Sequence, residues 1–187
     1  MSRKLILAAV AALLAGPALA QDVPDLPGPN LVIEVTGQAK GVVVIDLLPD
    51  VAPKHVAQIA ALARDGAYDG VIFHRVIDGF MAQTGDVEYG KAGGDTSYAG
   101  MGGSSLPDIP AEFSNLSFQR GIVGMARSQD PNSANSQFFI MFDDGAFLDG
   151  QYTVVGRVIK GMDVVDAIAR GEPPAKPDVM EKVTVQQ

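Results

Sequence analysis

The sequence predicts a mainly β domain, an eight-stranded antiparallel barrel whose two open ends are each capped by an α-helix. Two observations lead to this prediction. Short runs of β-branched and apolar residues recur between glycine, proline and polar residues, and only two segments carry apolar residues at helical spacing. We expect strands at 31–36, 41–48, 71–75, 80–83, 122–125, 137–142, 153–158 and 179–185.

The connections follow from the residues between these runs. Gly-Gln-Ala-Lys at 37–40 predicts a hairpin between the first two strands. A helix is expected over 53–65, because it begins with proline and is followed by Gly66. A second helix is expected over 161–170, where apolar residues fall on one face. The glycine-rich segment 87–110 predicts a long, ordered surface loop.

The first 20 residues match a secretory signal peptide. Arg3 and Lys4 precede an apolar run at 5–15, and the small residues that follow predict cleavage after Ala20. This run of 11 residues is shorter than the roughly 20 that a membrane-spanning helix needs, so an uncleaved anchor is the weaker alternative. No membrane insertion is expected after cleavage.

Cleavage after residue 20 leaves two segments. Residues 21–29 are rich in proline and are expected to form a short extended leader. Residues 30–187 are expected to form one domain, which is large enough for a sizeable core. No heptad repeat or large apolar stripe indicates an oligomer, so a monomer is expected.

Charge and cysteine content narrow the class of protein. Loss of the signal peptide takes the net charge from −8 to −10, which disfavours nucleic acid and anionic membrane surfaces as partners. The absence of cysteine excludes disulfides, thiol catalysis and zinc–thiolate sites. Export without disulfides fits a periplasmic location, and full secretion stays open.

Two runs combine polar and apolar residues in a way that indicates a binding site. Residues 73–86 read Phe-His-Arg-Val-Ile-Asp-Gly-Phe-Met-Ala-Gln-Thr-Gly-Asp, and residues 136–140 read Ser-Gln-Phe-Phe-Ile. A turn at Gly79 would place Arg75 beside an aromatic and thioether surface on adjacent strands. Such a surface suits a small apolar ring attached to a polar amide, which describes proline in a peptide.

Together these runs closely resemble the active-site segments of the cyclophilins, the barrel-shaped peptidyl-prolyl isomerases. The resemblance extends over about 31–185 and implies an enzyme that needs neither metal nor cofactor. Arg75 falls at the family's catalytic arginine. The positions that the resemblance assigns to substrate binding are Phe80, Met81, Gln83, Ala126, Arg127, Gln137, Phe139, Phe147, Leu148 and Tyr152.

The reaction that this resemblance implies explains the arginine. Rotation about an X–Pro bond meets a barrier of ~18–20 kcal/mol because the amide is conjugated. In the twisted transition state the prolyl nitrogen gains a lone pair, which a guanidinium can hydrogen-bond there but not in the planar ground state. Arg75 is the expected donor, because it stays charged and offers a fork that lysine lacks.

The sequence departs from the commonest pattern of the family at four positions. Phe147 stands where many eukaryotic members carry the tryptophan that helps bind cyclosporin, so weak cyclosporin binding is expected. Tyr152 replaces a frequent histidine, and Asp78 replaces a frequent proline. Arg127 replaces a frequent asparagine that acts mainly through its backbone. These changes resemble the bacterial exported branch.

Other chemistries find little support. The two histidines form no His-Glu-x-x-His pattern, no Gly-x-Ser-x-Gly elbow is present, and no Gly-Lys-Ser/Thr follows the glycine-rich segment. His74 is expected on the opposite face of its strand from Arg75, in a structural role, and His55 carries no chemical signal.

Two functional hypotheses remain. The first is an exported isomerase that assists folding by acting on proline-containing polypeptides. The second is a proline-peptide binding module or holdase chaperone with incidental turnover. Arg75 together with Gln83 and Gln137 favours the enzyme, since a pure binder could lose the arginine and keep the ring pocket.

Overall fold

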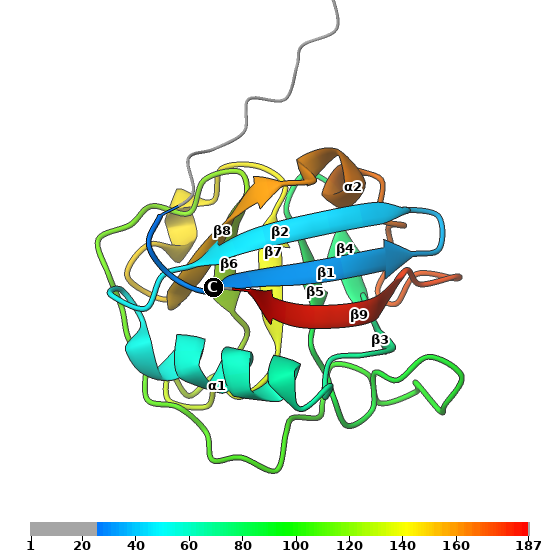
Figure 1. Ribbon diagram of the computed structural model, residues 1–187, viewed down its shortest axis with the longest axis horizontal. Helices are drawn as coiled ribbons and strands as arrows, with labels where there is room; N and C mark the ends of the chain where they lie inside the picture. The colour runs from blue at the N-terminus through cyan, green and yellow to red at the C-terminus, as the bar shows by residue number, and fades with distance from the viewer. Residues whose placement is uncertain (1–25, 187) are drawn as a thin grey trace, which may run out of the picture.

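Nine strands form one antiparallel sheet in the structure, a computed structural model that describes residues 26–186 (Figure 1). The order of strands across the sheet is β3-β9-β1-β2-β8-β6-β7-β5-β4. Their bounds are β1 Asn30–Thr36, β2 Gly41–Leu47, β3 Val71–Ile72, β4 Arg75–Ile77, β5 Met81–Thr84, β6 Ile122–Met125, β7 Phe138–Met141, β8 Val154–Lys160 and β9 Val179–Gln186.

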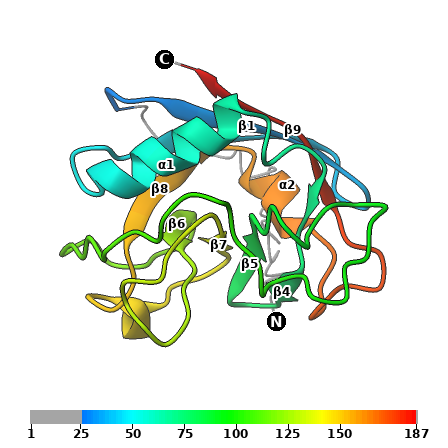
Figure 2. The ribbon, with the colours of Figure 1, turned by 90° about the horizontal axis from the view of Figure 1, so that it is seen from below.

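The two edge strands of this sheet follow each other in the chain. β3 pairs with β9, β4 pairs with β5, and only two residues lie between β3 and β4. The sheet must therefore curl until its edges approach each other, as Figure 2 shows. The mainly β, curled antiparallel fold is confirmed, but the single strand predicted over 71–75 is wrong. Phe73 and His74 are both buried and separate two short strands with different partners.

The other strands agree with the prediction to within two residues at either end. The β1–β2 hairpin turns at 37–40, with Val35 opposite Gly41. Because apolar side chains must reach the same core from each strand, the two-residue alternation in the sequence was sufficient to locate these strands.

Helix α1 (Pro53–Arg64) covers part of the sheet beside β9. Proline occupies its first turn, where no backbone donor is needed, and Val56, Ile59 and Ala63 face the core. Figure 1 shows α1 below strands β1, β2 and β9, and α2 above them.

Helix α2 is shorter than expected. It covers Met162–Asp166, whereas the sequence predicted a helix over 161–170. The predicted apolar face exists, since Val165 and Ile168 are buried. The chain leaves the helix because the buried carboxylate of Asp178 accepts a hydrogen bond from the Ala169 amide at 2.7 Å, and Gly171 forms a bridge with Val76.

Strands β5 and β7 are buried on both faces. Ala82 and Ile140 lie on one face and belong to the main core. Met81 and Phe139 lie on the other face and belong to a second apolar cluster. Alternation along these strands therefore gives the molecule a separate apolar surface outside its main core, on which a site can be built.

The loop expected over 87–110 is organised by one buried carboxylate. Asp86 Oδ1 accepts hydrogen bonds from the amides of Glu88 and Tyr89, at 3.1 and 2.9 Å. Its Oδ2 accepts from the amides of Gly100 and Gly102, at 2.7 and 2.9 Å. These bonds compensate for burial of the charge and fix the 100–102 turn.

The signal peptide predicted at 1–20 lies outside the described residues, as does the first part of the leader predicted at 21–29. Strand β1 begins at Asn30. Among residues 26–186, no helix has the length and apolar character needed to cross a bilayer.

Candidate active site

Strand register brings three of the predicted residues into one row. Arg75 of β4 pairs with Gln83 of β5, and Gln83 pairs with Phe139 of β7. Directly opposed residues on neighbouring strands project from the same face. The arginine, the amide and the aromatic ring therefore share one surface, although Phe139 is far from the other two in sequence.

The row continues to a glycine that makes room for the aromatic floor. Phe139 pairs with Gly124 of β6. A Cβ atom on Gly124 would lie 2.5 Å from Cζ of Phe139 and 2.6 Å from Cε1 of Phe118. These two rings stack with centroids 5.8 Å apart, so the missing side chain at 124 is what lets them lie over β6.

A pocket of about 440 Å³ lies over this surface. Its walls contain every residue that the resemblance assigned to the site except Gln137. They also contain Gln151, which was not assigned. Met81, Phe139 and Leu148 are almost fully buried, whereas Phe147 is 64% exposed at the rim. The lining residues are Arg75, Phe80, Met81, Gln83, Ala126, Arg127, Phe139, Phe147, Leu148, Gln151 and Tyr152.

The rim is built from aromatic rings that support one another. Phe80 and Phe147 lie 5.5 Å apart between centroids, and the edge of the Tyr152 ring meets Phe139 at 5.9 Å. Leu148 belongs to a short 3₁₀ helix, Ala146–Leu148, that follows β7. The result is an apolar cup with polar groups at its margin, an arrangement typical of small-ligand sites.

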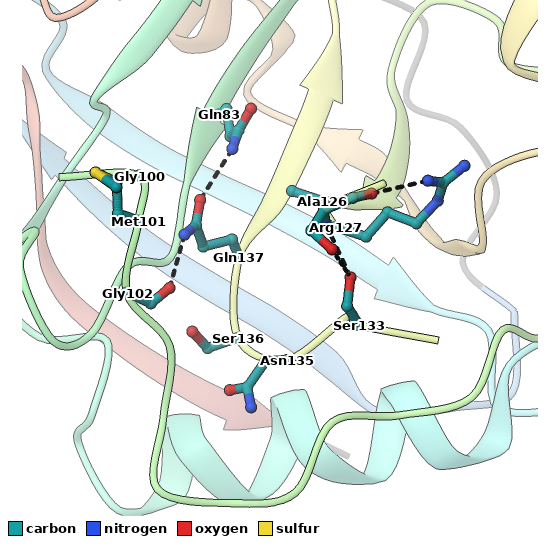
Figure 3. A pocket seen from close by; sticks show the side chains of 11 residues that line it. Gln83, Gly100, Met101, Gly102, Ala126, Arg127, Ser133, Asn135, Ser136 and Gln137 are labelled. Carbon is teal, nitrogen blue, oxygen red and sulfur yellow. Dashed lines mark hydrogen bonds between the residues drawn. The ribbon is translucent and has the colours of Figure 1, made fainter. Parts of the chain in front are cut away.

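A second pocket of about 300 Å³ adjoins the first and shares Gln83, Ala126 and Arg127 with it. Figure 3 shows Gln137 here, between Gln83 and the loop. Gln83 Nε2 donates to Gln137 Oε1 at 2.9 Å, and Gln137 Nε2 donates to the Gly102 carbonyl at 2.8 Å. The two amides therefore tie the strand row to the loop that Asp86 organises.

The guanidinium of Arg75 is paired on one edge only. Its Nε donates to Glu172 Oε2 at 2.7 Å, and its two terminal nitrogens have no hydrogen-bond partner among residues 26–186. The side chain is 41% exposed, at the margin of the larger pocket. A charged donor with free N–H groups thus lies beside an apolar cup.

His74 is buried behind this site and lines neither of the two pockets described. Burial lowers the pKa of its imidazole, although the nearby Asp86 carboxylate acts in the opposite direction. A Cβ on Gly100 would lie 3.1 Å from its ring, so the histidine supports the 100–102 turn from below. Its geometry fits the structural role expected from the sequence.

Several residues that border the site were not predicted from the sequence. Gln151 lines the larger pocket, and Gly100, Met101, Gly102 and Asn135 line the smaller one. Gln151 directly precedes Tyr152, and this position could have indicated that it borders the site. Nothing in the sequence indicated Glu172, because it reaches Arg75 across 97 residues of chain.

Within residues 26–186, no group of three or more histidine, cysteine, aspartate or glutamate side chains could bind a metal ion. The polar groups at the pocket are instead hydrogen-bond donors and amides, which suit a neutral peptide.

Comparison with known proteins decides the family. The family model for "Cyclophilin type peptidyl-prolyl cis-trans isomerase/CLD" matches residues 31–186. The chain belongs to this family. A Brucella suis protein named "Probable peptidyl-prolyl cis-trans isomerase" is 61% identical over 153 residues, which cover 78% of this chain and 78% of the relative.

Solved cyclophilins have the same fold. A cyclophilin from Hirschia baltica superposes with a TM-score of 0.72 at 30% identity, covering 86% of this chain and 74% of the other. One from Cryptosporidium parvum also gives 0.72, at 26% identity, covering 84% of this chain and 99% of the other. This cyclophilin is an isomerase, as the sequence predicted.

Proposed function

We propose that this cyclophilin accelerates X–Pro rotation in exported proteins, with Arg75 as its catalytic residue. The proposal rests on the position of the Arg75 guanidinium at the margin of an apolar pocket. Its two terminal nitrogens have no partner within the described residues and lie beside an apolar cup of about 440 Å³. A proline ring fits such a cup, and its nitrogen would then lie next to the donor.

Arg75 would act in the transition state alone. When the X–Pro amide twists, conjugation is lost and the prolyl nitrogen becomes a hydrogen-bond acceptor. A donor that meets only this form lowers the barrier without tightening ground-state binding. A thousandfold acceleration needs about 4 kcal/mol, which is within reach of a charged hydrogen bond in a partly desolvated site.

The other residues would hold the substrate while one group turns. Met81, Phe139 and Leu148 would fix the ring, because their packing leaves them little freedom. Gln83 and the backbone at 126–127 border both pockets and would hold the chain on either side of the bond. Restricting motion to the preceding carbonyl favours the reactive geometry. The related Cryptosporidium parvum structure was determined in the presence of the dipeptide Ala-Pro, which supports a proline-containing ligand.

An envelope location rests on the amino-terminal pattern. The basic pair, apolar run and small-residue ending within residues 1–20 direct export in proteins that carry them. X–Pro isomerisation is slow enough to be a rate-limiting step of folding, so an isomerase there has a clear use. Fractionation of the producing cell, with amino-terminal sequencing of the mature protein, tests this; a mature chain that begins at Gln21 is expected.

The decisive experiment measures cis–trans exchange of a short X–Pro peptide by NMR, with Arg75→Ala and Arg75→Lys beside the wild type. We expect kcat/KM to fall at least tenfold in Arg75→Ala while the fold is retained, and to recover little in Arg75→Lys because lysine lacks the fork. Equal rates in wild type and Arg75→Ala would show that another residue is the donor.

A proline-peptide binding module or holdase is the competing function. Exposed Phe147 and Met101 at the two pockets would suit capture of unfolded chains. The same NMR titration separates the two functions, because a binding module shifts peptide signals without accelerating exchange. Weak cyclosporin binding is expected in either case, since phenylalanine at 147 has no indole N–H.

A further inference from the structure

The side chain of Arg127 joins two segments that are distant in sequence. Its Nη1 donates to the carbonyls of Ser128 and Gln129, at 2.9 and 3.3 Å. Its Nη2 donates to the carbonyl of Gln151 at 2.9 Å. In Figure 3 the guanidinium extends to the side of the pocket away from Gln137. One cation therefore spans from the 127–129 turn to the loop that forms the far wall of the larger pocket.

The same guanidinium also reaches the aromatic wall. Its Cζ lies 4.4 Å from the centroid of the Tyr152 ring, a cation–π distance. Tyr152 in turn meets Phe139 edge-on at 5.9 Å. Gln151 Nε2 donates to the Phe147 carbonyl at 2.7 Å. Contacts thus lead from Arg127 both to the floor of the pocket and to its exposed rim.

The wall loop, residues 147–152, is held at two points. Near its start, Asp149 accepts hydrogen bonds from the Ser117 hydroxyl at 2.7 Å and the Phe118 amide at 2.8 Å. Near its end, the side-chain contacts described above come from Arg127. The two sets of contacts involve different residues, so removing the Arg127 contacts leaves those of Asp149 in place.

We propose that Arg127 is a positioning residue that straps the wall loop against the proline pocket, an inference that rests on the proposed function of that pocket. Its hydrogen-bond acceptors in the described chain are backbone carbonyls, so its role is geometric and does not depend on an ion pair. Both terminal nitrogens are occupied by the protein. The side chain therefore acts through Gln151 and Tyr152, whereas the resemblance to the family assigns substrate contact to the backbone at this position.

Arginine is required for this arrangement. The planar guanidinium donates in two directions and presents a face to Tyr152 at the same time. A lysine ammonium is a point charge without such a face, so it cannot reproduce all the contacts. Arg127→Lys should consequently behave more like Arg127→Ala than like the wild type.

The chain contains a closely matched control. Arg170 lies over the ring of Phe142 at 4.2 Å and donates to two backbone carbonyls, those of Asp166 and Ile168. It also pairs with Asp78 at 3.0 Å, and it lines neither of the two pockets. Arg170→Ala therefore removes the same cation–π and carbonyl contacts, together with one ion pair, from a residue that lines neither pocket.

The test combines amide hydrogen exchange with isomerase kinetics on the purified protein. The amides of Gln151 and Tyr152 donate to the Leu148 carbonyl, so opening of the wall loop exposes them. In Arg127→Ala we expect their exchange to accelerate about tenfold, and in Arg127→Lys by about fivefold. We expect kcat/KM to fall about three- to tenfold, mainly through KM, in both variants. Arg170→Ala should leave both measurements within about twofold of the wild type.

The outcomes separate the strap from the proposed function. Exchange at 147–152 that stays unchanged in both Arg127 variants overturns the strap, and so does an equal acceleration in Arg170→Ala. If Arg127→Ala does not fold, Arg127→Lys carries the test alone. If the wild type lacks isomerase activity while the loop opens in the variants, the proposed function fails and the strap stands.

Discussion

Arg75 and Glu172 form an ion pair in which Nε of the guanidinium donates to Oε2 of the carboxylate at 2.7 Å. Glu172 follows Gly171, whose amide and carbonyl both bond to Val76 on β4, at 2.9 and 2.8 Å. The carboxylate is therefore fixed next to the strand that carries the arginine. This contact sets the plane of the guanidinium and leaves its terminal nitrogens without a partner among residues 26–186.

Replacement of Glu172 should lower activity with little effect on stability. We expect Glu172→Ala to reduce kcat/KM about three- to tenfold, because the guanidinium can then rotate out of its productive plane. Glu172→Gln should retain most activity, since its amide oxygen can still accept from Nε. The free energy of unfolding should change by less than about 1 kcal/mol, as expected for an exposed pair.

Asp166→Ala is the matched control for Glu172. It breaks another exposed pair, with Arg120 at 2.7 Å, away from the pocket. Peptide exchange by NMR and thermal unfolding should be measured for all three variants. Equal activity of Glu172→Ala and the wild type would show that the arginine is positioned by its strand alone.

Gly124 should tolerate no side chain, because of the rings that pack over it. In Gly124→Ala, the added Cβ would lie 2.5 Å from Phe139 and 2.6 Å from Phe118. We expect a loss of about 1–3 kcal/mol in stability from overpacking. Peptide affinity should also fall, because Phe139 forms the floor of the pocket.

Gly94→Ala provides the comparison for this substitution. Gly94 lies in the exposed loop, and its nearest neighbour to a new Cβ is the Lys91 carbonyl at 3.3 Å. Chemical denaturation measures the stability of both variants, and peptide titration measures their affinity. Wild-type affinity in Gly124→Ala would mean that the floor can shift without cost to the site.

Most strands were predictable because their signal is local. Alternating β-branched residues locate β1, β2 and β9 whatever their neighbours are. The division of 71–75 into β3 and β4 was not local: Val71 pairs with Met180, whereas Arg75 pairs with Gln83. The segment Val-Ile-Phe-His-Arg contains no glycine, proline or other turn residue to show that its two ends join opposite edges of a sheet.

The residues of the site were likewise predictable only where their signal is local. The pocket residues stand in three short runs, at 73–86, 124–127 and 136–140, and in a loop at 147–152. Their spacing resembles a known family, so they were named from the sequence. Their supports come from distant segments, as when Glu172 reaches Arg75. The contact of Glu112 with His55, two residues that line neither pocket, likewise had no signal in the sequence. Arg127 was expected to act through its backbone, and only the structure shows where its guanidinium lies.

His74 should make stability depend on pH near neutrality. Burial lowers the pKa of its imidazole in the folded state, so the unfolded chain binds the proton more readily. The contribution to stability is complete above the unfolded pKa of about 6.5 and is lost as the pH falls through the folded value. Between pH 7 and 5, His74→Gln should therefore show a flatter stability curve than the wild type.

Denaturant unfolding at several pH values tests this, with His55 retained in both proteins. Identical slopes for wild type and His74→Gln would show that another group titrates in this window. A second outcome is informative about the loop: because Gly100 packs on this histidine, His74→Gln should also increase hydrogen exchange at 100–102.

Glu112 should stabilise α1 from outside the helix. The helix lacks a side-chain cap of its own, since Ala52 precedes it. Glu112 Oε2 accepts hydrogen bonds from the amides of Lys54 and His55, at 3.1 and 3.2 Å, and from Nδ1 of His55 at 2.7 Å. A carboxylate at a helix amino terminus satisfies exposed donors and complements the helix dipole.

Replacement of Glu112 should therefore lower the free energy of unfolding at neutral pH, and should lower it less in acid. Partial burial raises the pKa of its carboxyl, but the hydrogen bonds from His55 and Lys54 outweigh this and hold the pKa below its usual value. The stabilisation is present above the unfolded pKa of about 4.3 and is lost as the pH falls through the folded value. Glu112→Gln should cost about 1–2 kcal/mol at pH 7, and the difference from the wild type should shrink below about pH 4. Glu181→Gln, on the exposed face of β9, is the control and should have the wild-type free energy of unfolding at every pH. If the loss of stability in Glu112→Gln persists unchanged in acid, titration of the carboxylate plays no part, and the effect comes from the changed side-chain geometry.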